Sequence, residues 1–425
     1  MIAPDALPRL LHGATGRPMS LAQHEEVFGA VVRTGGLLEH LEASGLTGRG
    51  GAGFPTFRKA NLIREQRGHH KIMVVNAMEG EPAAHKDQTL LAANPHLVLD
   101  GAELLASSIG ARDVAVCVSR ENASAVNHLK RALHERERRS QRGPRFELHT
   151  PPHRYVAGEE SALVHWLDDH ASLPQYRPAR PSILRIGHAP VLLDNAETCA
   201  NVGLIGRYGG EWFRGLGTER SPGTTLVSVS GAVERPAVLE VALGTPLRTI
   251  LRHAHADADP RAVLLGGYGG SWIDAAHLDT PYANESFAPI GVSVGAGVVM
   301  VLARDGCGLV ETQRIVRWMA NESARQCGPC AFGLPALADD LAHLVARGRD
   351  GDAAAARLVE RCSVIEGRGA CRHPDGVIRL VRSALGVFAG DLVEHVAGRG
   401  CAAGRAGRHY ATVPHLERED ELVWE

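Results

Sequence analysis

The sequence has few cysteines and few aromatic residues, and it has no long apolar segment. Eight cysteines in 425 residues are too few for a disulfide scaffold. The longest apolar stretch, residues 290–303, is shorter than the roughly 20 residues that a membrane-spanning helix needs. The amino terminus lacks the basic start and the continuous apolar stretch of a signal peptide. These absences predict a soluble cytoplasmic protein with no direct insertion into a membrane.

A strong excess of charge of either sign is also missing. The net charge is −2 and the isoelectric point is about 6.9, which gives no general electrostatic reason to bind nucleic acid. Residues 130–142 are rich in basic side chains but also contain glutamates. They form either a solvated helix end or a docking patch for an acidic partner. No H-E-x-x-H or G-x-S-x-G motif occurs, so hydrolysis has no support.

The pattern of apolar residues predicts two or three domains. Short β-branched segments at 71–76 and 112–119 alternate with helical patterns at 97–109 and 122–133, which is typical of an α/β domain with a mostly parallel sheet. Strand patterns at 224–230 and 238–241 precede a helical pattern at 246–253. We expect an α/β domain over residues 1–217, a ββα-containing unit over 218–303, a helical bundle over 304–400 and an irregular tail over 401–425.

The helical bundle is predicted from apolar residues that recur with a helical period. One face would carry Leu309, Thr312, Ile315, Val316 and Met319, and the next helix Leu337, Leu341 and Leu344. Gly348 can end that helix. Two further helices are expected over about 352–362 and 376–397.

A glycine-rich segment, residues 45–56, is the most informative part of the chain. It reads Gly-Leu-Thr-Gly-Arg-Gly-Gly-Ala-Gly-Phe-Pro-Thr. Such a loop lets backbone N–H groups approach an anion closely, and Arg49 and Lys59 are available to pair with a phosphate. The segment is neither a G-x-x-x-x-G-K-[ST] phosphate loop nor a clean dinucleotide fingerprint. The residues alone therefore leave two interpretations, a nucleotide or flavin cradle and a turn-rich loop.

Further motifs follow this loop in a fixed order. They are residues 76–82 (Asn-Ala-Met-Glu-Gly-Glu-Pro), Lys86-Asp87, 155–160 (Tyr-Val-Ala-Gly-Glu-Glu), 195–201 (Asn-Ala-Glu-Thr-Cys-Ala-Asn), 230–236 (Ser-Gly-Ala-Val-Glu-Arg-Pro), and Glu322-Ser323 with Cys327-Gly-Pro-Cys330 and Cys371. Over about residues 30–395 the chain resembles the flavin- and NADH-binding 51 kDa subunit of respiratory complex I and its hydrogenase and formate dehydrogenase relatives. The resemblance implies a Rossmann-like FMN-binding domain, a ubiquitin-like β-grasp (SLBB) domain and a helical bundle with an iron-sulfur site.

The resemblance also implies which residues contact FMN. The positions that match FMN contacts are Gly48, Arg49, Gly50, Gly51, Gly53, Lys59, Asn76, Glu159, Asn195 and Thr198, and Glu79, Tyr155 and Gly158 are further cofactor-binding candidates. Polar side chains suit this role because the flavin ring edge and the ribityl chain need hydrogen-bond donors and acceptors. The alternative is that these are turn and capping residues kept for the fold. Two departures lie nearby, since the family commonly has aspartate at Met78 and asparagine at Asp194.

The nicotinamide side departs further from the family. Glu81 and Glu160 match carboxylates that contact NADH, and Phe54 matches one aromatic residue of the adenine pocket. Leu62 and Arg180 replace two further aromatic residues, and Arg177 replaces a lysine. Each lost stacking contact is worth about 0.5–1.5 kcal/mol. Either Arg180 compensates, by stacking on adenine or pairing with the 2′-phosphate of NADPH, or the pocket has decayed.

The metal motif lacks one residue. Relatives bind a 4Fe-4S cluster with C-x₂-C-x₂-C and a fourth cysteine about forty residues later. Cys327, Cys330 and Cys371 match three ligands, whereas Ala324 occupies the first position. The alternatives are a 3Fe-4S cluster, a 4Fe-4S cluster completed by solvent or by Cys362, His373 or Cys401, a zinc ion, and an empty site. The remaining cysteines, Cys117, Cys199 and Cys307, are expected to be buried apolar residues.

These features predict an oxidoreductase subunit. It would pass electrons between NAD(P)H and a ferredoxin or iron-sulfur protein subunit through FMN, with a membrane-bound redox partner as a second option. The short amino-terminal segment before the glycine loop and the altered nicotinamide pocket favour a divergent stand-alone paralogue. The alternatives are a ferredoxin-linked flavoprotein without a nicotinamide cofactor and a non-catalytic scaffold with a vestigial redox site. The sequence does not identify the donor, the acceptor or the direction of electron flow.

Overall fold

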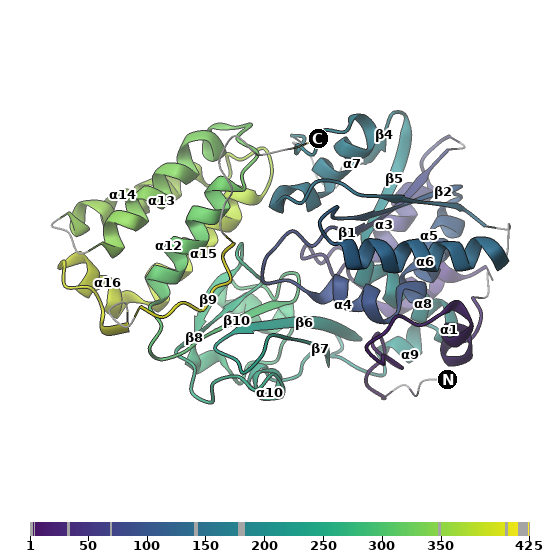
Figure 1. Cartoon of the computed structure of the whole chain (residues 1–425), viewed down its shortest axis with the longest axis horizontal. Coiled ribbons are helices and arrows are strands. Elements are labelled where there is room, and N and C mark those ends of the chain that lie inside the picture. The colour runs from purple at the N-terminus through teal and green to yellow at the C-terminus, as the bar shows by residue number, and fades with distance from the viewer. Residues whose placement is uncertain are drawn as a thin grey trace.

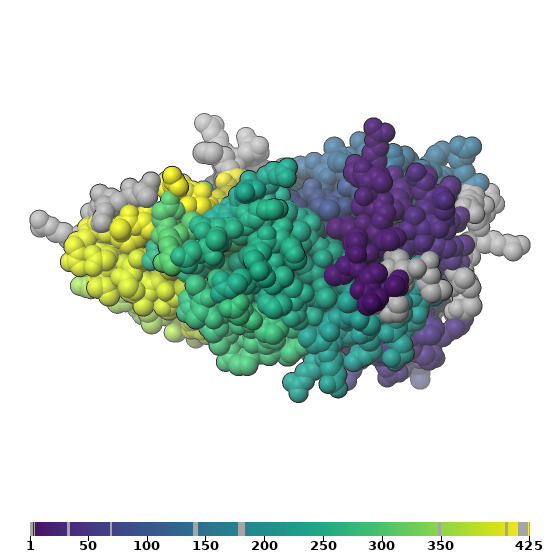
Figure 2. All heavy atoms as spheres, turned by 90° about the horizontal axis from the view of Figure 1, so that it is seen from below, coloured from purple at the N-terminus to yellow at the C-terminus, as the bar shows by residue number. Residues whose placement is uncertain are grey.

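The computed structural model describes residues 3, 5–31, 35–68, 70–139, 143–176, 183–346, 350–403, 407–414 and 424. Within this part of the chain, two five-stranded sheets and a group of long helices form three units (Figure 1). The helices of the carboxyl-terminal unit lie at one end of the molecule and the first sheet lies at the other. Figure 2 shows the second unit between the two ends.

The first sheet is mostly parallel, as the sequence predicts. Its strand order is β3-β2-β1-β5-β4. Strands β3, β2, β1 and β5 are parallel, and β4 pairs antiparallel with β5 at the edge. The bounds are β1 Ile72–Ala77, β2 Asp113–Val118, β3 Arg145–His149, β4 Leu184–Ile186 and β5 Ala189–Asn195.

Helices cover this sheet and also pack on one another. They are α1 Leu21–Phe28, α2 Leu37–Ser44, α3 Thr56–Arg64, α4 Lys86–Ala93, α5 Pro95–Ile109, α6 Ala123–Arg139, α7 Glu160–Asp169, α8 Ala196–Tyr208 and α9 Gly210–Arg214. Helices α5 and α8 touch closely because Gly101 has no side chain. A Cβ atom on Gly101 would lie 1.7 Å from the carbonyl oxygen of Cys199. Part of the basic segment of α6 turns inward, since Arg136 pairs with Glu103 and Asp100 of α5.

The second sheet follows the predicted order of two strands and a helix. The strands are β6 Thr224–Gly231, β7 Ala237–Ala242, β8 Ala262–Leu265, β9 Ser271–Asp274 and β10 Val298–Leu302, in the order β7-β6-β10-β8-β9. Strands β6 and β10 are parallel and the other neighbours are antiparallel. Helix α10, Leu247–His253, packs on this sheet through buried Leu247, Ile250 and Leu251, and the short helix α11 spans Asn284–Phe287.

The third unit consists of α12 Gly308–Asn321, α13 Leu334–Val345, α14 Gly351–Ile365, α15 His373–Val387 and α16 Ala389–Val396. The predicted apolar faces of α12 and α13 are buried. Helix α13 ends at Val345, and Gly348 lies outside the described residues. The single helix expected over 376–397 is wrong, because the chain breaks at Phe388. That ring is buried against Trp272, 5.2 Å between ring centroids, and against the backbone of Gly308.

The carboxyl-terminal segment has no regular structure over residues 407–414, as expected, but it packs on the third unit. The buried carboxylate of Glu311 accepts hydrogen bonds from the N–H groups of Tyr410 and Ala411. The Tyr268 hydroxyl donates to the carbonyl oxygen of Thr412 at 2.6 Å. Across the residues described, none of the helices has the length and apolar character needed to cross a membrane.

Candidate functional site

The order of the first sheet reverses between β1 and β5, and the region at the carboxyl ends of these two strands is called the crevice below. From β1 the chain moves outward to β2 and β3, and it then returns to β5 on the other side of β1. Asn76 of β1 lies opposite Asn195 of β5 at the end of both strands. Ligands of doubly wound sheets bind at such switch points, because the connections leave in opposite directions and open a space.

The glycine-rich loop lies against this crevice. Residues 48–53 have the spacing G-x-G-x-x-G, but they join α2 to α3 and not a strand to a helix, so the loop is not a Rossmann fingerprint. The Arg49 N–H donates to the Thr198 hydroxyl at 2.9 Å. A Cβ atom on Gly50 would lie 3.4 Å from Cβ of Asn195. The loop therefore packs over the start of α8.

The tip of the loop presents backbone donors. Among the described residues, none of the N–H groups of residues 50–54 makes a close hydrogen bond outside the turn that residues 49–52 form. Gly51 and Gly53 have φ angles of 105° and 63°, which residues with a side chain rarely adopt. Successive N–H groups in such a turn form a concave anion site. This arrangement fits a phosphate group.

The two predicted cations have different surroundings. The Arg49 guanidinium donates to the Thr47 hydroxyl at 3.3 Å and to the Pro222 carbonyl at 3.2 Å, and burial lowers the pKa of Arg49. It therefore contacts the connection to the second unit. Lys59 donates to Glu160 at 2.8 Å and lies 3.8 Å from Asp194. The positive charge of Lys59 thus lies between two carboxyl groups at the end of β5.

Asp194 is a buried carboxyl group at this crevice. Its Oδ2 atom has no hydrogen-bond partner among the described residues. Burial raises the pKa of Asp194 to about 6, Lys59 opposes that rise and Glu160 adds to it. Asp194 is therefore a buried acid whose pKa lies above the ordinary range of a carboxyl group.

A buried ionic network fixes the orientation of Asn195. Its amide nitrogen donates to Asp87 at 2.6 Å, and its carbonyl oxygen accepts from Lys86 at 3.2 Å. Lys86 also pairs with Asp87 at 2.8 Å and with Glu197 at 2.9 Å. Burial alone would lower the pKa of Lys86, but Asp87 and Glu197 raise it. Lys86 is therefore a cation, and the amide of Asn195 cannot turn freely.

The two predicted glutamates after β1 both have partners within the protein. Glu79 accepts from the N–H groups of Asp87 and Gln88 at 2.8 and 3.0 Å, which caps α4. Glu81 accepts from the N–H of Tyr268 in the second unit at 3.0 Å. Burial raises the pKa of Glu79 to about 7 and that of Glu81 to about 8. These carboxyl groups therefore anchor the segment after β1 to α4 and to the second unit.

Residues 155–160 connect the crevice to the third unit. The carbonyl of Gly158 accepts from the Asn76 amide at 2.9 Å. Glu159 caps α7 by accepting from two N–H groups at 2.9 and 3.1 Å. At the other end, the Tyr155 ring lies 5.5 Å from that of Trp318 on α12, between ring centroids. The negative charge of a Cys371 thiolate would act on both Tyr155 and Glu159.

The three predicted metal ligands are neighbours in the third unit. Cys330 lies in a five-residue π-helix, Pro329–Gly333, a rare element that is frequent at functional sites. Its thiol interacts with those of Cys327 and Cys371. Burial raises the pKa of Cys371 to about 11 and that of Cys330 further. Ala324 leaves the first family position without a thiol.

The sulfur atoms of Cys327, Cys330 and Cys371 do not all lie within 4.8 Å of one another. Among the described residues, one group of three such ligands has all its ligand atoms within 4.8 Å of one another, and it consists of Cys307, His395 and Cys401. Cys401 is therefore with that group and not with the predicted cluster. Nε2 of His373 donates to the Met319 carbonyl oxygen at 2.9 Å. Cys362 is buried near Arg382 and Glu366.

The expected nicotinamide residues are only partly described. The Phe54 ring follows the N–H groups of the loop tip and is 38% exposed, so its ring can receive a stacking partner. Leu62 is half-buried on α3. Arg177 and Arg180 lie outside the described residues. Glu160 is at the crevice through its bond to Lys59.

The sequence does not reveal the ionic network around Asn195. Lys86 and Asp87 form one motif and Glu197 lies inside another, but neither pattern shows that they meet. Glu197 also accepts from the Thr225 hydroxyl and from the Leu226 N–H, both at 2.9 Å. Its pairing with a strand of the second unit depends on tertiary structure, so no local signal could have revealed it.

Comparisons with known proteins agree with this geometry. Residues 41–204 match the Nuo51 FMN-binding domain, and residues 311–395 match the NADH-ubiquinone oxidoreductase-F iron-sulfur binding region. The second F-type subunit of NADH-quinone oxidoreductase from Rhizobium meliloti (strain 1021) is 31% identical over 379 residues, which are 86% of this chain and 90% of the relative. NADP-reducing hydrogenase subunit HndC of Solidesulfovibrio fructosivorans is 27% identical, over 86% of this chain and 77% of the relative.

A solved structure has a similar fold. It is a chain of an NAD⁺-reducing NiFe-hydrogenase in the H₂-reduced state, with a TM-score of 0.78 and 29% sequence identity. The match covers 85% of this chain and 62% of the hydrogenase chain. The present chain therefore spans less than two thirds of that relative's length.

Proposed function

Because the chain belongs to the family of F-type subunits of NADH-quinone oxidoreductase, we propose that it transfers electrons between NAD(P)H and an iron-sulfur partner through FMN. The observation that carries the proposal is the row of N–H groups at residues 50–54, which make no close hydrogen bond beyond the turn itself and lie in the loop that packs against Thr198 and Asn195 at the end of β5. A loop with only a structural role would have no reason to place these N–H groups beside the amide and carboxyl side chains that are held in place at the crevice.

The residues at the crevice fit FMN. The loop N–H groups suit its phosphate. Asn76 and Asn195, which the Gly158 carbonyl and the Lys86 network hold in place, suit the polar edge of the ring and the ribityl chain. When bound, FMN accepts a hydride and releases electrons one at a time. The protein's part is to bind it, orient it and exclude water from the buried side of the crevice.

The nicotinamide cofactor would approach from the exposed side of the loop. Phe54 is exposed there, and Glu160 lies at the same edge of the crevice. Arg180 would favour NADPH through its 2′-phosphate, because a guanidinium matches a phosphate with two parallel hydrogen bonds. The name of the hydrogenase subunit HndC refers to NADP, which agrees with this choice for this chain.

Cys327, Cys330 and Cys371 would hold an iron-sulfur cluster with one iron lacking a cysteine ligand. Their electrostatic contacts with one another support a shared site, and a cluster, unlike a single ion, does not require all three sulfurs within 4.8 Å of one another. The four-residue turn Tyr155–Gly158 joins this site to Asn76. At about 2 Å per residue it spans less than about 10 Å, so the two sites are close.

The second sheet is proposed to be the ubiquitin-like (SLBB) module of the family. Its order, with two central parallel strands flanked by antiparallel hairpins, supports that assignment. It contacts the crevice through Glu81 and Tyr268 and through Asn284, whose amide nitrogen would lie 3.8 Å from a Cβ atom on Gly53. A ferredoxin or iron-sulfur subunit would accept the electrons.

Anaerobic purification followed by cofactor analysis tests the proposal. We expect extractable FMN at about one per chain, together with iron and acid-labile sulfide. NADPH should bleach the flavin band at a lower concentration than NADH. FMN that is bleached only by a reduced ferredoxin would support the ferredoxin-linked alternative. A folded protein without flavin, even after incubation with FMN, would contradict the proposal.

A further inference from the structure

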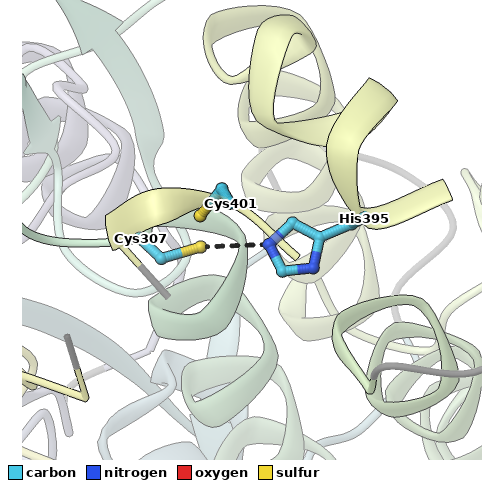
Figure 3. A group of neighbouring side chains, drawn as sticks. All are labelled: Cys307, His395 and Cys401. Atoms are coloured by element: carbon cyan, nitrogen blue, oxygen red, sulfur yellow. Dashed lines mark hydrogen bonds between the residues drawn. The ribbon is translucent and has the colours of Figure 1, made fainter. Parts of the chain in front are cut away.

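A buried group of two thiols and an imidazole lies at the opposite end of α12 from the predicted cluster. Cys307 precedes the first residue of α12, His395 lies on α16, and Cys401 follows that helix. Their side chains point toward one another (Figure 3). The residues are 2%, 3% and 2% exposed, respectively. Burying polar groups without partners costs free energy, so three such side chains that converge in an apolar core indicate a bound ligand.

The distances match a tetrahedral metal site. The three ligand atoms all lie within 4.8 Å of one another, and Sγ of Cys307 is 3.5 Å from Nε2 of His395. Around zinc, with Zn–S near 2.3 Å and Zn–N near 2.0–2.1 Å, tetrahedral geometry separates sulfur from nitrogen by about 3.5 Å and two sulfurs by about 3.8 Å. The side chains therefore need little movement to enclose an ion.

The imidazole is oriented for this role. Nε2 faces the thiol, and the backbone carbonyl of Val345 lies close to the ring. The Nδ1 atom is buried, without a partner of hydrogen-bond geometry among the described residues. A proton on Nδ1, toward the carbonyl, leaves the Nε2 lone pair directed at the two sulfurs, which is the usual arrangement behind a metal-bound histidine.

We propose that Cys307, His395 and Cys401 bind one structural zinc ion. Binding would release the two thiol protons to solvent and form two Zn–S bonds and one Zn–N bond. A water molecule would occupy the fourth position. Two thiolates and an imidazole suit zinc better than magnesium or calcium, which prefer oxygen ligands.

The site is separate from the predicted iron-sulfur site. Helix α12 has 14 residues between the two, which corresponds to about 21 Å at 1.5 Å per residue. The ion would instead join three segments: the turn after β10, the last helix and the segment that runs back along α12. Its expected role is therefore to fasten the carboxyl-terminal segment.

Metal analysis of the purified full chain tests the proposal. We expect about one zinc per chain, with an X-ray absorption spectrum at the zinc edge that shows two sulfur neighbours near 2.3 Å and nitrogen or oxygen near 2.0 Å. Cys401→Ser and His395→Gln should lose most of the zinc, whereas FMN and iron should remain. Cys362→Ser, a buried cysteine of the same unit, is the matched control and should keep the zinc.

A second variant distinguishes loss of a zinc ligand from misfolding. Cys401→His replaces one zinc ligand by another, so it should retain zinc where Cys401→Ser does not. A chelator should lower the melting temperature of the wild type but leave that of Cys401→Ser unchanged. Absence of zinc after purification with added zinc would overturn the proposal. So would a Cys307–Cys401 disulfide found by mass spectrometry, or equal zinc loss in Cys362→Ser.

Discussion

The flavin crevice and the cysteine site of the third unit differ in how they are built. The crevice consists largely of backbone groups and of side chains that bond one another, such as Asn195 with Lys86 and Asp87. The cysteine site depends on three separate thiols and has Ala324 where a fourth would stand. In a network of mutual hydrogen bonds, each side chain is held by the others, so losing one disturbs the rest. Separate metal ligands are each held by their own part of the fold, so one can be lost while the others stay in position. This difference explains how the cysteine site can lack one ligand while the network around Asn195 keeps its members.

The largest expected effect comes from removing a thiol. Cys330→Ser should remove nearly all iron and sulfide, because two cysteines cannot hold a cluster against solvent. FMN content should stay the same, since the neighbours of Cys330 among the described residues, Cys327, Cys371 and Ser323, do not belong to the crevice. Iron and flavin are measured on the same sample, with Cys117→Ala in the first sheet as a control. Loss of both cofactors together would show that the two sites are not independent.

The reciprocal change is Gly50→Val in the loop. A β-branched side chain would occupy the space where the backbone meets a phosphate, so FMN binding should weaken at least about tenfold, the cost of one charged hydrogen bond. Gly386→Val, where an added side chain meets open space, is the matched control. Retained flavin in Gly50→Val, measured by fluorescence after ultrafiltration, would show that the loop does not hold it.

Restoring the fourth ligand sharpens the contrast between the sites. Ala324→Cys should complete the coordination and give an ordinary 4Fe-4S centre. The electron paramagnetic resonance spectrum of the reduced protein should change accordingly, while flavin content stays constant. An unchanged spectrum would indicate that the fourth iron already has a strong ligand or that residue 324 points away.

The nicotinamide preference should change with Arg180→Phe. Removing the guanidinium should weaken the binding of NADPH, and the introduced ring should strengthen the binding of NADH by stacking, each by about tenfold or less. The concentrations that half-reduce the flavin measure both effects. Equal responses of the wild type to the two cofactors would show that Arg180 does not reach the ribose.

The smallest expected effect concerns pH. Burial raises the pKa of Glu81 to about 8 from an ordinary value of 4.5, so the folded state binds more protons than the unfolded state between these values. The free energy of unfolding should therefore fall as pH rises from about 5 to about 8, by an amount on the order of 1 kcal/mol or more. Glu81→Gln keeps an acceptor for the Tyr268 N–H and should flatten this slope. If the free energy of unfolding of Glu81→Gln, measured with denaturant, falls with pH as steeply as that of the wild type, another group is responsible for the titration.

Local patterns predicted most elements of the fold. The period of apolar residues indicates α12 and α13, and the alternation of strands and helices indicates the parallel sheet. The break at Phe388 was missed because Trp272 and Gly308, far away in sequence, create the pocket for its ring. For the same reason the meeting of Cys307 with Cys401 could not be foreseen, since neither lies in a recognisable motif.

Anaerobic rapid mixing of the loaded protein with NADPH, and separately with NADH, tests the central claim most directly. Absorbance of the flavin band and the electron paramagnetic resonance of freeze-quenched samples are followed together. The account predicts that the flavin is reduced first and the cluster afterwards, and that Cys330→Ser shows only the flavin phase. A flavin that neither nicotinamide cofactor reduces, or a cluster that stays oxidised in the wild type although the flavin is reduced and the cluster can be reduced by dithionite, would contradict it.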